Sequence, residues 1–150
     1  MAIRLMVAAV LALGLTGCEE EEAGMSLSFV RDIQMEGGVT VPLPEGYEAV
    51  EVPGAVRLTE AGGARSQTSI TVDWADAAPV GGDATALADT GFQHTVTRLE
   101  AIGSGGQEWK LLAWKQSGSR WLIVDAQEQA EDGEPDFAVP IAVLKALTVD

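Results

Sequence analysis

The sequence predicts an α+β domain built on an antiparallel sheet. Three apolar segments between residues 92 and 129 are separated by two glycine-containing turns, the spacing expected of a three-strand meander. A final apolar segment, at about 137–146, places its large side chains at helical spacing instead. The predicted architecture is therefore a central meander covered by one C-terminal helix.

The N-terminal segment has the features of an export signal. Arg4 precedes an apolar run from Leu5 to Leu15, which is too short for the roughly 20 apolar residues of a membrane span. The run ends in Leu15-Thr16-Gly17-Cys18, which resembles the lipobox of bacterial lipoproteins. The resemblance implies cleavage after Gly17 and acylation of Cys18. A buried N-terminal helix is the alternative.

These features divide the chain into three parts. Residues 1–17 are expected to be a lipoprotein signal peptide, residues 18–26 an acidic tether, and residues 27–150 a single domain. The mature protein would then be lipid-anchored to the cell membrane or outer membrane, on the periplasmic side. Cys18 is the only cysteine, and four glutamates follow it, a setting that disfavours a reactive thiolate. A weak cation site or a sorting signal is the alternative for this acidic run.

The chain is strongly acidic, with a formal charge of −14. Arg4 is the only charged residue of the predicted leader, so the mature part carries −14 − 1 = −15. Nucleic-acid binding requires a basic patch against phosphate charge, and the sequence offers none. Attraction to anionic lipid is disfavoured for the same reason, so acyl chains must supply the anchor. A negative field of this size attracts basic proteins.

The first half of the domain predicts short strands. Pro42 cannot donate to a ladder, which places its strand at an edge or end at that point. Pro53-Gly54 is expected to join two strands as a hairpin. Residues 75–90 are expected to be irregular, with one helical turn near Ala84 to Ala88. The predicted strands are residues 27–35, 39–43, 49–52, 55–59 and 68–74, the last with Ile70, Val72 and Trp74 on one face.

The segments on either side of Ser117-Gly118 predict a hairpin. If these two residues form the loop, Trp114 pairs with Trp121, and Lys110 pairs with Asp125, both favourable cross-strand contacts. Both faces of the hairpin are apolar, so we expect it to be central and covered on both sides. The second face carries Trp109, Leu111 and Ala113 opposite Leu122, Val124 and Ala126.

The C-terminal helix is predicted from Phe137 or Ala138 to Ala146. Pro140 is tolerated only in the first turn of a helix, which fixes where the helix begins. The apolar residues Phe137, Ile141 and Leu144 then lie on one side of it. This face is expected to be core.

A second resemblance covers most of residues 28–150. The stretch Val39-Thr40-Val41-Pro42-Leu43-Pro44-Glu45-Gly46-Tyr47, the meander and the closing helix resemble the PsbP-like group of small α+β domains. DcrB-like envelope lipoproteins and some type VI secretion immunity lipoproteins are similar in outline. The resemblance implies a mixed or antiparallel sheet flanked by helices and a non-catalytic role in binding a partner. No functional residue carries over from it.

The sequence contains no recognisable catalytic or metal-binding motif. His94 is the single histidine, in a strand-like run without a nucleophile motif, and it leaves no credible zinc set. We therefore expect no enzyme activity, no cofactor and no metal. The densest carboxylates do not follow the EF-hand spacing and are interpreted as a solvated rim. They are Asp125, Glu128, Glu131, Asp132, Glu134 and Asp136.

The favoured hypothesis is a membrane-anchored envelope lipoprotein that is not an enzyme and binds a basic protein partner. An immunity lipoprotein that neutralises a secreted toxin is one alternative, and a carboxylate-dependent envelope hydrolase is another. The expected contact lies in the acidic segment that precedes the closing helix, at Glu128, Glu131, Asp132, Glu134 and Asp136.

Overall fold

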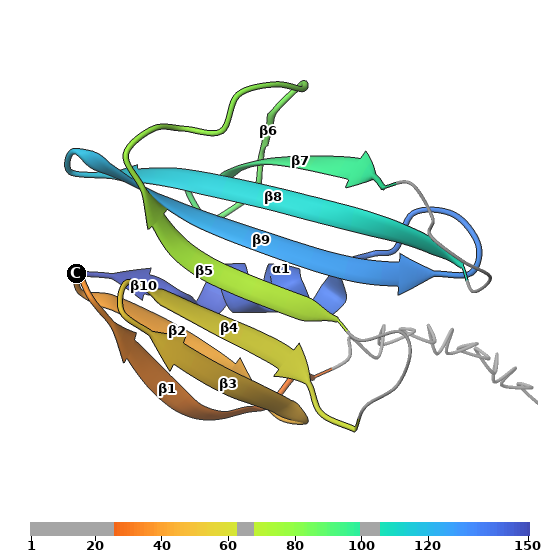
Figure 1. The fold of residues 1–150 in the computed structure, drawn as a ribbon, viewed down its shortest axis with the longest axis horizontal. Coiled ribbons are helices and arrows are strands. Elements are labelled where there is room, and N and C mark those ends of the chain that lie inside the picture. The colour runs from red at the N-terminus through yellow and green to blue at the C-terminus, as the bar shows by residue number, and fades with distance from the viewer. Residues whose placement is uncertain (1–25, 63–67, 100–105) are drawn as a thin grey trace, which may run out of the picture.

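The computed structural model describes residues 26–62, 68–99 and 106–150 (Figure 1). The predicted signal peptide, Cys18 and nearly all of the acidic tether lie outside the described residues. The described chain is mostly antiparallel sheet with one C-terminal helix, which is an α+β fold. In this part of the chain, no helix has the length and hydropathy needed to cross a membrane.

A small sheet, sheet A, has the strand order β1-β2-β10. Strand β10 pairs with β2 only at Val39 and Thr40. Among the described strands, the rest of β2 has only β1 as a neighbour. Pro42 therefore lies at an edge, as predicted, where a missing N–H does not interrupt the hydrogen bonds between strands. The strands of sheet A are β1 (Phe29–Met35), β2 (Val39–Pro44) and β10 (Thr148–Val149).

A larger sheet, sheet B, has seven strands in the order β3-β4-β5-β9-β8-β7-β6. The hairpin across Pro53-Gly54 is confirmed by the pairing of Val52 with Ala55. All neighbouring strands are antiparallel, and β9 lies between β5 and β8. The strands are β3 (Tyr47–Val52), β4 (Ala55–Glu60), β5 (Ser69–Ala75), β6 (Thr85–Ala86), β7 (Gln93–Arg98), β8 (Gln107–Ser117) and β9 (Arg120–Ala130).

The loop between β8 and β9 corrects the predicted hairpin register. Ser117 pairs with Arg120, so the loop is Gly118-Ser119 and not Ser117-Gly118. Gly118 has φ 61°, and the first loop position of a type I′ or II′ turn requires a positive φ, which glycine adopts without strain. Glycine therefore takes the first loop position, where the prediction had given it the second.

The one-residue change in the loop moves every cross-strand partner by two residues. Trp114 lies opposite Ile123 rather than Trp121, and Lys110 lies opposite Gln127. A shift of two residues keeps each side chain on its face. The predicted faces of the hairpin are therefore correct, and the predicted register is wrong. The predicted ion pair between Lys110 and Asp125 still forms, but between residues that are not directly opposite each other.

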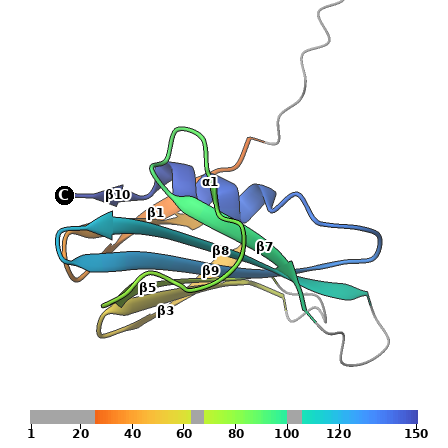
Figure 2. The ribbon, with the colours of Figure 1, turned by 90° about the horizontal axis from the view of Figure 1, so that it is seen from above.

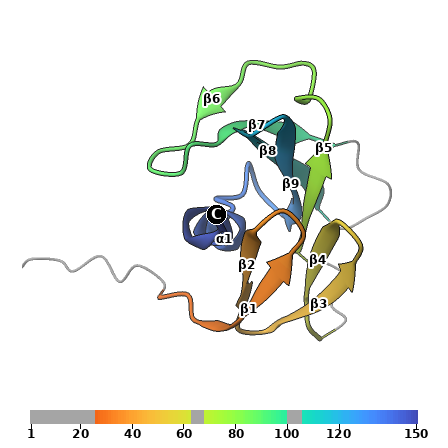
Figure 3. The same ribbon diagram turned by 90° about the vertical axis from the view of Figure 1, so that its left-hand side faces the viewer.

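Helix α1 (Ala138–Ala146) agrees closely with the predicted range, and Pro140 lies in its first turn. The helix packs against β2. Figures 2 and 3 place α1 and sheet A together on one face of sheet B. The second layer is thus shared by the helix and a separate small sheet, where the sequence predicted the helix alone.

The core lies between the two layers. Its largest fully buried side chains come from both sheets, from α1 and from the segments that flank them, and no polar side chain in the described residues is fully buried. They are Phe92, Phe137, Ile33, Leu58, Ile70, Leu111, Leu122, Leu144, Val39, Val41, Val56 and Val72.

Candidate functional site

The face of sheet B that points away from the core, here called the outer face, is directed toward the viewer in Figure 1. Residues that pair directly across an antiparallel ladder have their side chains on the same face. The registers therefore show which residues form a row across the strands of the outer face. One row runs across five strands, from Val50 through Arg57, Thr71 and Asp125 to Leu112. The charged and polar side chains of this row therefore lie between two apolar ones.

The outer face is only partly covered. Trp114 is 8% exposed, but Leu112 and Ile123 are only half-buried. The prediction that this hairpin is covered on both sides is therefore wrong for the outer face. The face contains a hollow of about 320 Å³, whose lining is mostly charged and polar residues. It is lined by Arg57, Ser69, Thr71, Asp73, Ile123, Asp125 and Gln127.

The structure separates the carboxylates that the sequence grouped together. Asp125 lies on the outer face, where Lys110 Nζ approaches its Oδ2 to 2.6 Å. Glu128 is three residues further along β9, so its side chain is on the core side, opposite Trp109. The sequence prediction ended its strand near this point and treated the glutamate as part of a loop, whereas β9 continues to Ala130.

Glu128 lies in an environment that disfavours its charge. Burial raises the pKa of its carboxyl above the ordinary value, and the negative charges of Asp136 and then Glu60 raise it further. Burial likewise raises the pKa of Tyr47, to which Glu60 and Glu128 also contribute. A half-buried carboxyl of this kind is a poorer contact for a partner than an exposed one.

The remaining predicted contact residues fall into two groups, one at the start of α1 and one in the loop before it. Asp136 Oδ1 accepts a hydrogen bond from the backbone N–H of Ala138, the first residue of α1, at 3.0 Å, so its carboxylate is held at the start of the helix. Glu131, Asp132 and Glu134 are exposed in the connection between β9 and α1. Of the five predicted contact residues, these last three are well placed to reach a partner, and they are here called the acidic loop.

His94 and the carboxylates do not assemble a reactive centre among the described residues. His94 is half-buried in β7, as predicted, and its Nδ1 is 2.9 Å from the backbone oxygen of Thr85. Within the described ranges, no three His, Cys, Asp or Glu side chains are arranged to hold a metal ion.

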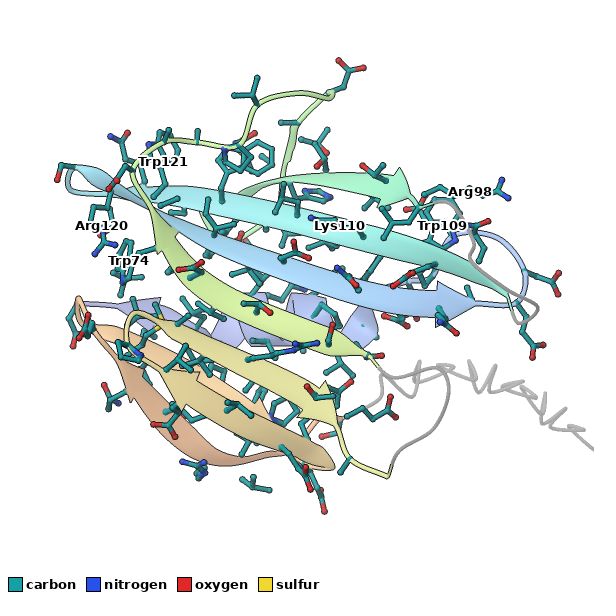
Figure 4. All side chains as sticks on the ribbon, viewed as in Figure 1. Trp74, Arg98, Trp109, Lys110, Arg120 and Trp121 are labelled. Carbon is teal, nitrogen blue, oxygen red and sulfur yellow. The ribbon has the colours of Figure 1, made fainter. Side chains whose placement is uncertain are left out.

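An aromatic contact at one end of sheet B escaped the sequence prediction. The Arg120 guanidinium lies over the Trp74 ring, 5.2 Å from its centroid, and Trp74 Nε1 donates to the backbone oxygen of Glu36 at 2.8 Å. Figure 4 shows Arg120, Trp74 and Trp121 near the β8–β9 loop, with Trp109 and Arg98 at the opposite end. The contact ties the β1–β2 turn of sheet A to sheet B.

Comparison with known proteins identifies the family. Residues 40–148 match the model of the type six secretion immunity 3 domain, Tsi3. The chain belongs to this family. It is 34% identical over 140 residues to the immune protein Tsi3 of Pseudomonas aeruginosa, covering 93% of this chain and 94% of that protein.

A solved structure shares the fold of this family member. A crystal structure from Bacteroides thetaiotaomicron superposes with a TM-score of 0.55 at 9% sequence identity, covering 79% of this chain. The match spans 47% of that longer chain. At this identity the similarity concerns the fold alone.

Proposed function

We propose that this protein is an immunity protein that binds a toxin of a type VI secretion system and neutralises it. The observation that carries the proposal is the 34% identity to an immune protein over nearly the whole of both chains. It favours the immunity alternative over general binding of an envelope partner. Neutralisation by binding makes the proposed role non-catalytic, in contrast to that of a carboxylate-dependent hydrolase.

We propose that electrostatic attraction brings a basic toxin to this acidic protein. The formal charge of −14 produces a negative field that steers a basic partner and is screened within about 8 Å at physiological ionic strength. Glu131, Asp132 and Glu134 are exposed and close together in the chain. We place the first contact with a basic toxin at this acidic loop.

The proposed location is the periplasmic side of the envelope. The lipobox-like Leu15-Thr16-Gly17-Cys18 supports acylation at Cys18 and membrane anchoring. Several acyl chains hold a protein firmly on a bilayer, whereas a negative domain gains nothing from anionic lipid. An anchored immunity protein would meet a toxin that arrives in the same compartment.

The test pairs the full chain with the product of a toxin gene found beside its own gene. Co-expression in the periplasm of a sensitive strain should restore growth, and calorimetry with the purified pair should show a complex that weakens as salt rises. The triple variant Glu131→Gln, Asp132→Asn, Glu134→Gln should bind more weakly at low salt. The matched control, Asp76→Asn, Asp83→Asn, Asp89→Asn, removes the same charge elsewhere. Failure of the parent chain to protect or bind would refute the proposal.

A further inference from the structure

Strand β3 leaves one edge of sheet B open. It pairs with β4 on one side, and no described strand pairs with its other side. The pair Val52–Ala55 closes a two-residue loop and carries the turn hydrogen bond. Because hydrogen-bonded and non-bonded pairs alternate along an antiparallel ladder, Ala49 and Glu51 point their backbone N–H and C=O groups outward.

This edge also exposes apolar side chains. Val50 is 59% exposed and Val52 is 53% exposed, and both belong to the outer face of sheet B. An unpaired strand edge with exposed apolar residues is a template for pairing with another chain. The strand contains no proline, and its register with β4 is regular over six residues, so its outward backbone groups are evenly spaced for an added strand.

A second hollow adjoins the same edge. It has a volume of about 190 Å³ and lies between the end of β1 and the β3–β4 hairpin. Its lining includes the apolar residues Met35 and Val56 and the acidic residues Glu36 and Glu51. Lysine and arginine side chains combine an aliphatic stem with a cationic head, and this lining matches both parts.

The charge of the chain decides between two occupants of the edge. A second copy would bring another formal −14 against the first, and a net charge this far from zero opposes self-association. A basic partner gains from the same field. In the described residues, the ion pair nearest the hollow is Arg31 Nη1 to Glu51 Oε1 at 3.5 Å, with both side chains 53% exposed. Such an exposed pair is weak enough to be rearranged on binding.

We propose that β3 accepts an extended segment of the toxin as an added strand, and that a lysine or arginine of this segment enters the hollow beside Glu36 and Glu51. Main-chain hydrogen bonds at Ala49 and Glu51 would supply affinity, and the hollow would supply selectivity for the basic side chain. The inference rests on the proposed immunity function and assigns it a surface separate from the acidic loop.

Hydrogen–deuterium exchange tests the added strand. The full chain is measured alone and with the purified product of the adjacent toxin gene. The amides of Ala49 and Glu51 should exchange rapidly in the free chain and at least about tenfold more slowly in the complex, because each gains a hydrogen bond. If a complex forms and these amides still exchange at the free rate, the added strand is refuted while the immunity function stands. If no complex forms, both fail.

Variants that remove the two negative charges at the hollow test it as a binding site. Glu36→Gln with Glu51→Gln should weaken toxin binding by about tenfold, the effect of losing a hydrogen bond to a charged group. Asp76→Asn with Asp83→Asn removes the same charge from exposed positions distant in sequence and should change affinity much less. Equal losses in the two variants would mean that only the overall field matters and would overturn the hollow as a specific site. Protection of β3 in the free chain that grows with its concentration would show self-pairing and would also overturn the inference.

Discussion

Lys110 Nζ and Asp125 Oδ2 meet at 2.6 Å across the two central strands, although the two residues are not directly opposite each other. Their side chains are 31% and 30% exposed, so solvent screens the pair only in part. A double-mutant cycle with Lys110→Ala and Asp125→Ala should give a coupling free energy of up to about 1 kcal/mol that decreases at high salt. The free energy of unfolding in urea measures it, and a salt-independent coupling would contradict the electrostatic origin.

Trp114 should contribute more to stability than Trp121. Trp114 is 8% exposed, whereas Trp121 is only half-buried on the same face. Trp114→Ala should lower the free energy of unfolding by about 3–5 kcal/mol, since it leaves a large cavity. Trp121→Ala serves as the control and should cost clearly less. Equal losses of unfolding free energy in the two variants would contradict the greater burial of Trp114.

Gly37 should tolerate alanine less well than Gly46. Both have nearly the same positive φ, 81° and 82°, so the backbone strain of substitution is matched. A Cβ at Gly37 would lie 2.9 Å from Cζ2 of Trp74, whereas a Cβ at Gly46 meets nothing within 4 Å. Gly46→Ala should cost about 1–2 kcal/mol. Gly37→Ala should cost more, and urea unfolding of the two variants compares them directly.

Glu128 should make stability decrease as the pH rises. Its folded pKa is raised above the ordinary 4.5, so the folded chain holds this proton more tightly than the unfolded chain does. The stabilisation is complete below the ordinary pKa and is lost as the pH rises through the raised folded pKa. Glu128→Gln should therefore be more stable than the parent at pH 7, with the difference shrinking toward pH 4. The melting temperature measures this, and Glu131→Gln in the acidic loop is the control.

Cys18 should decide where the protein is found. Cys18→Ser removes the thiol that the lipobox-like motif would present for acylation. The variant should leave the membrane fraction or accumulate unprocessed, with the circular dichroism of the folded domain unchanged. Mass spectrometry of the parent should show an acylated Cys18 at the N-terminus. An unmodified Cys18 in membrane-bound protein would contradict the proposed anchor.

The sequence predicts the local elements of this fold well and its long-range pairings poorly. The Pro53-Gly54 hairpin and helix α1 follow from turn chemistry and from helical spacing, which are local signals. The separate sheet A depends on β10 joining β2 across more than a hundred residues, and no local pattern encodes that. The candidate site shows the same limit. Glu128 was placed with the loop acids because a glutamate carries no sign of which face its strand will bury.

The position of β9 has a consequence for the order of assembly. Within sheet B, β3, β4 and β5 form one set of consecutive strands and β6, β7, β8 and β9 form another, joined only through the pairing of β5 with β9. Ser69 pairs with Gln127, a separation of 58 residues, so closing this seam carries the entropy of a long loop. Such non-local pairing slows folding. The sheet can close only after β9 has left the ribosome, and until then the edges of β5 and β8 are open to wrong partners.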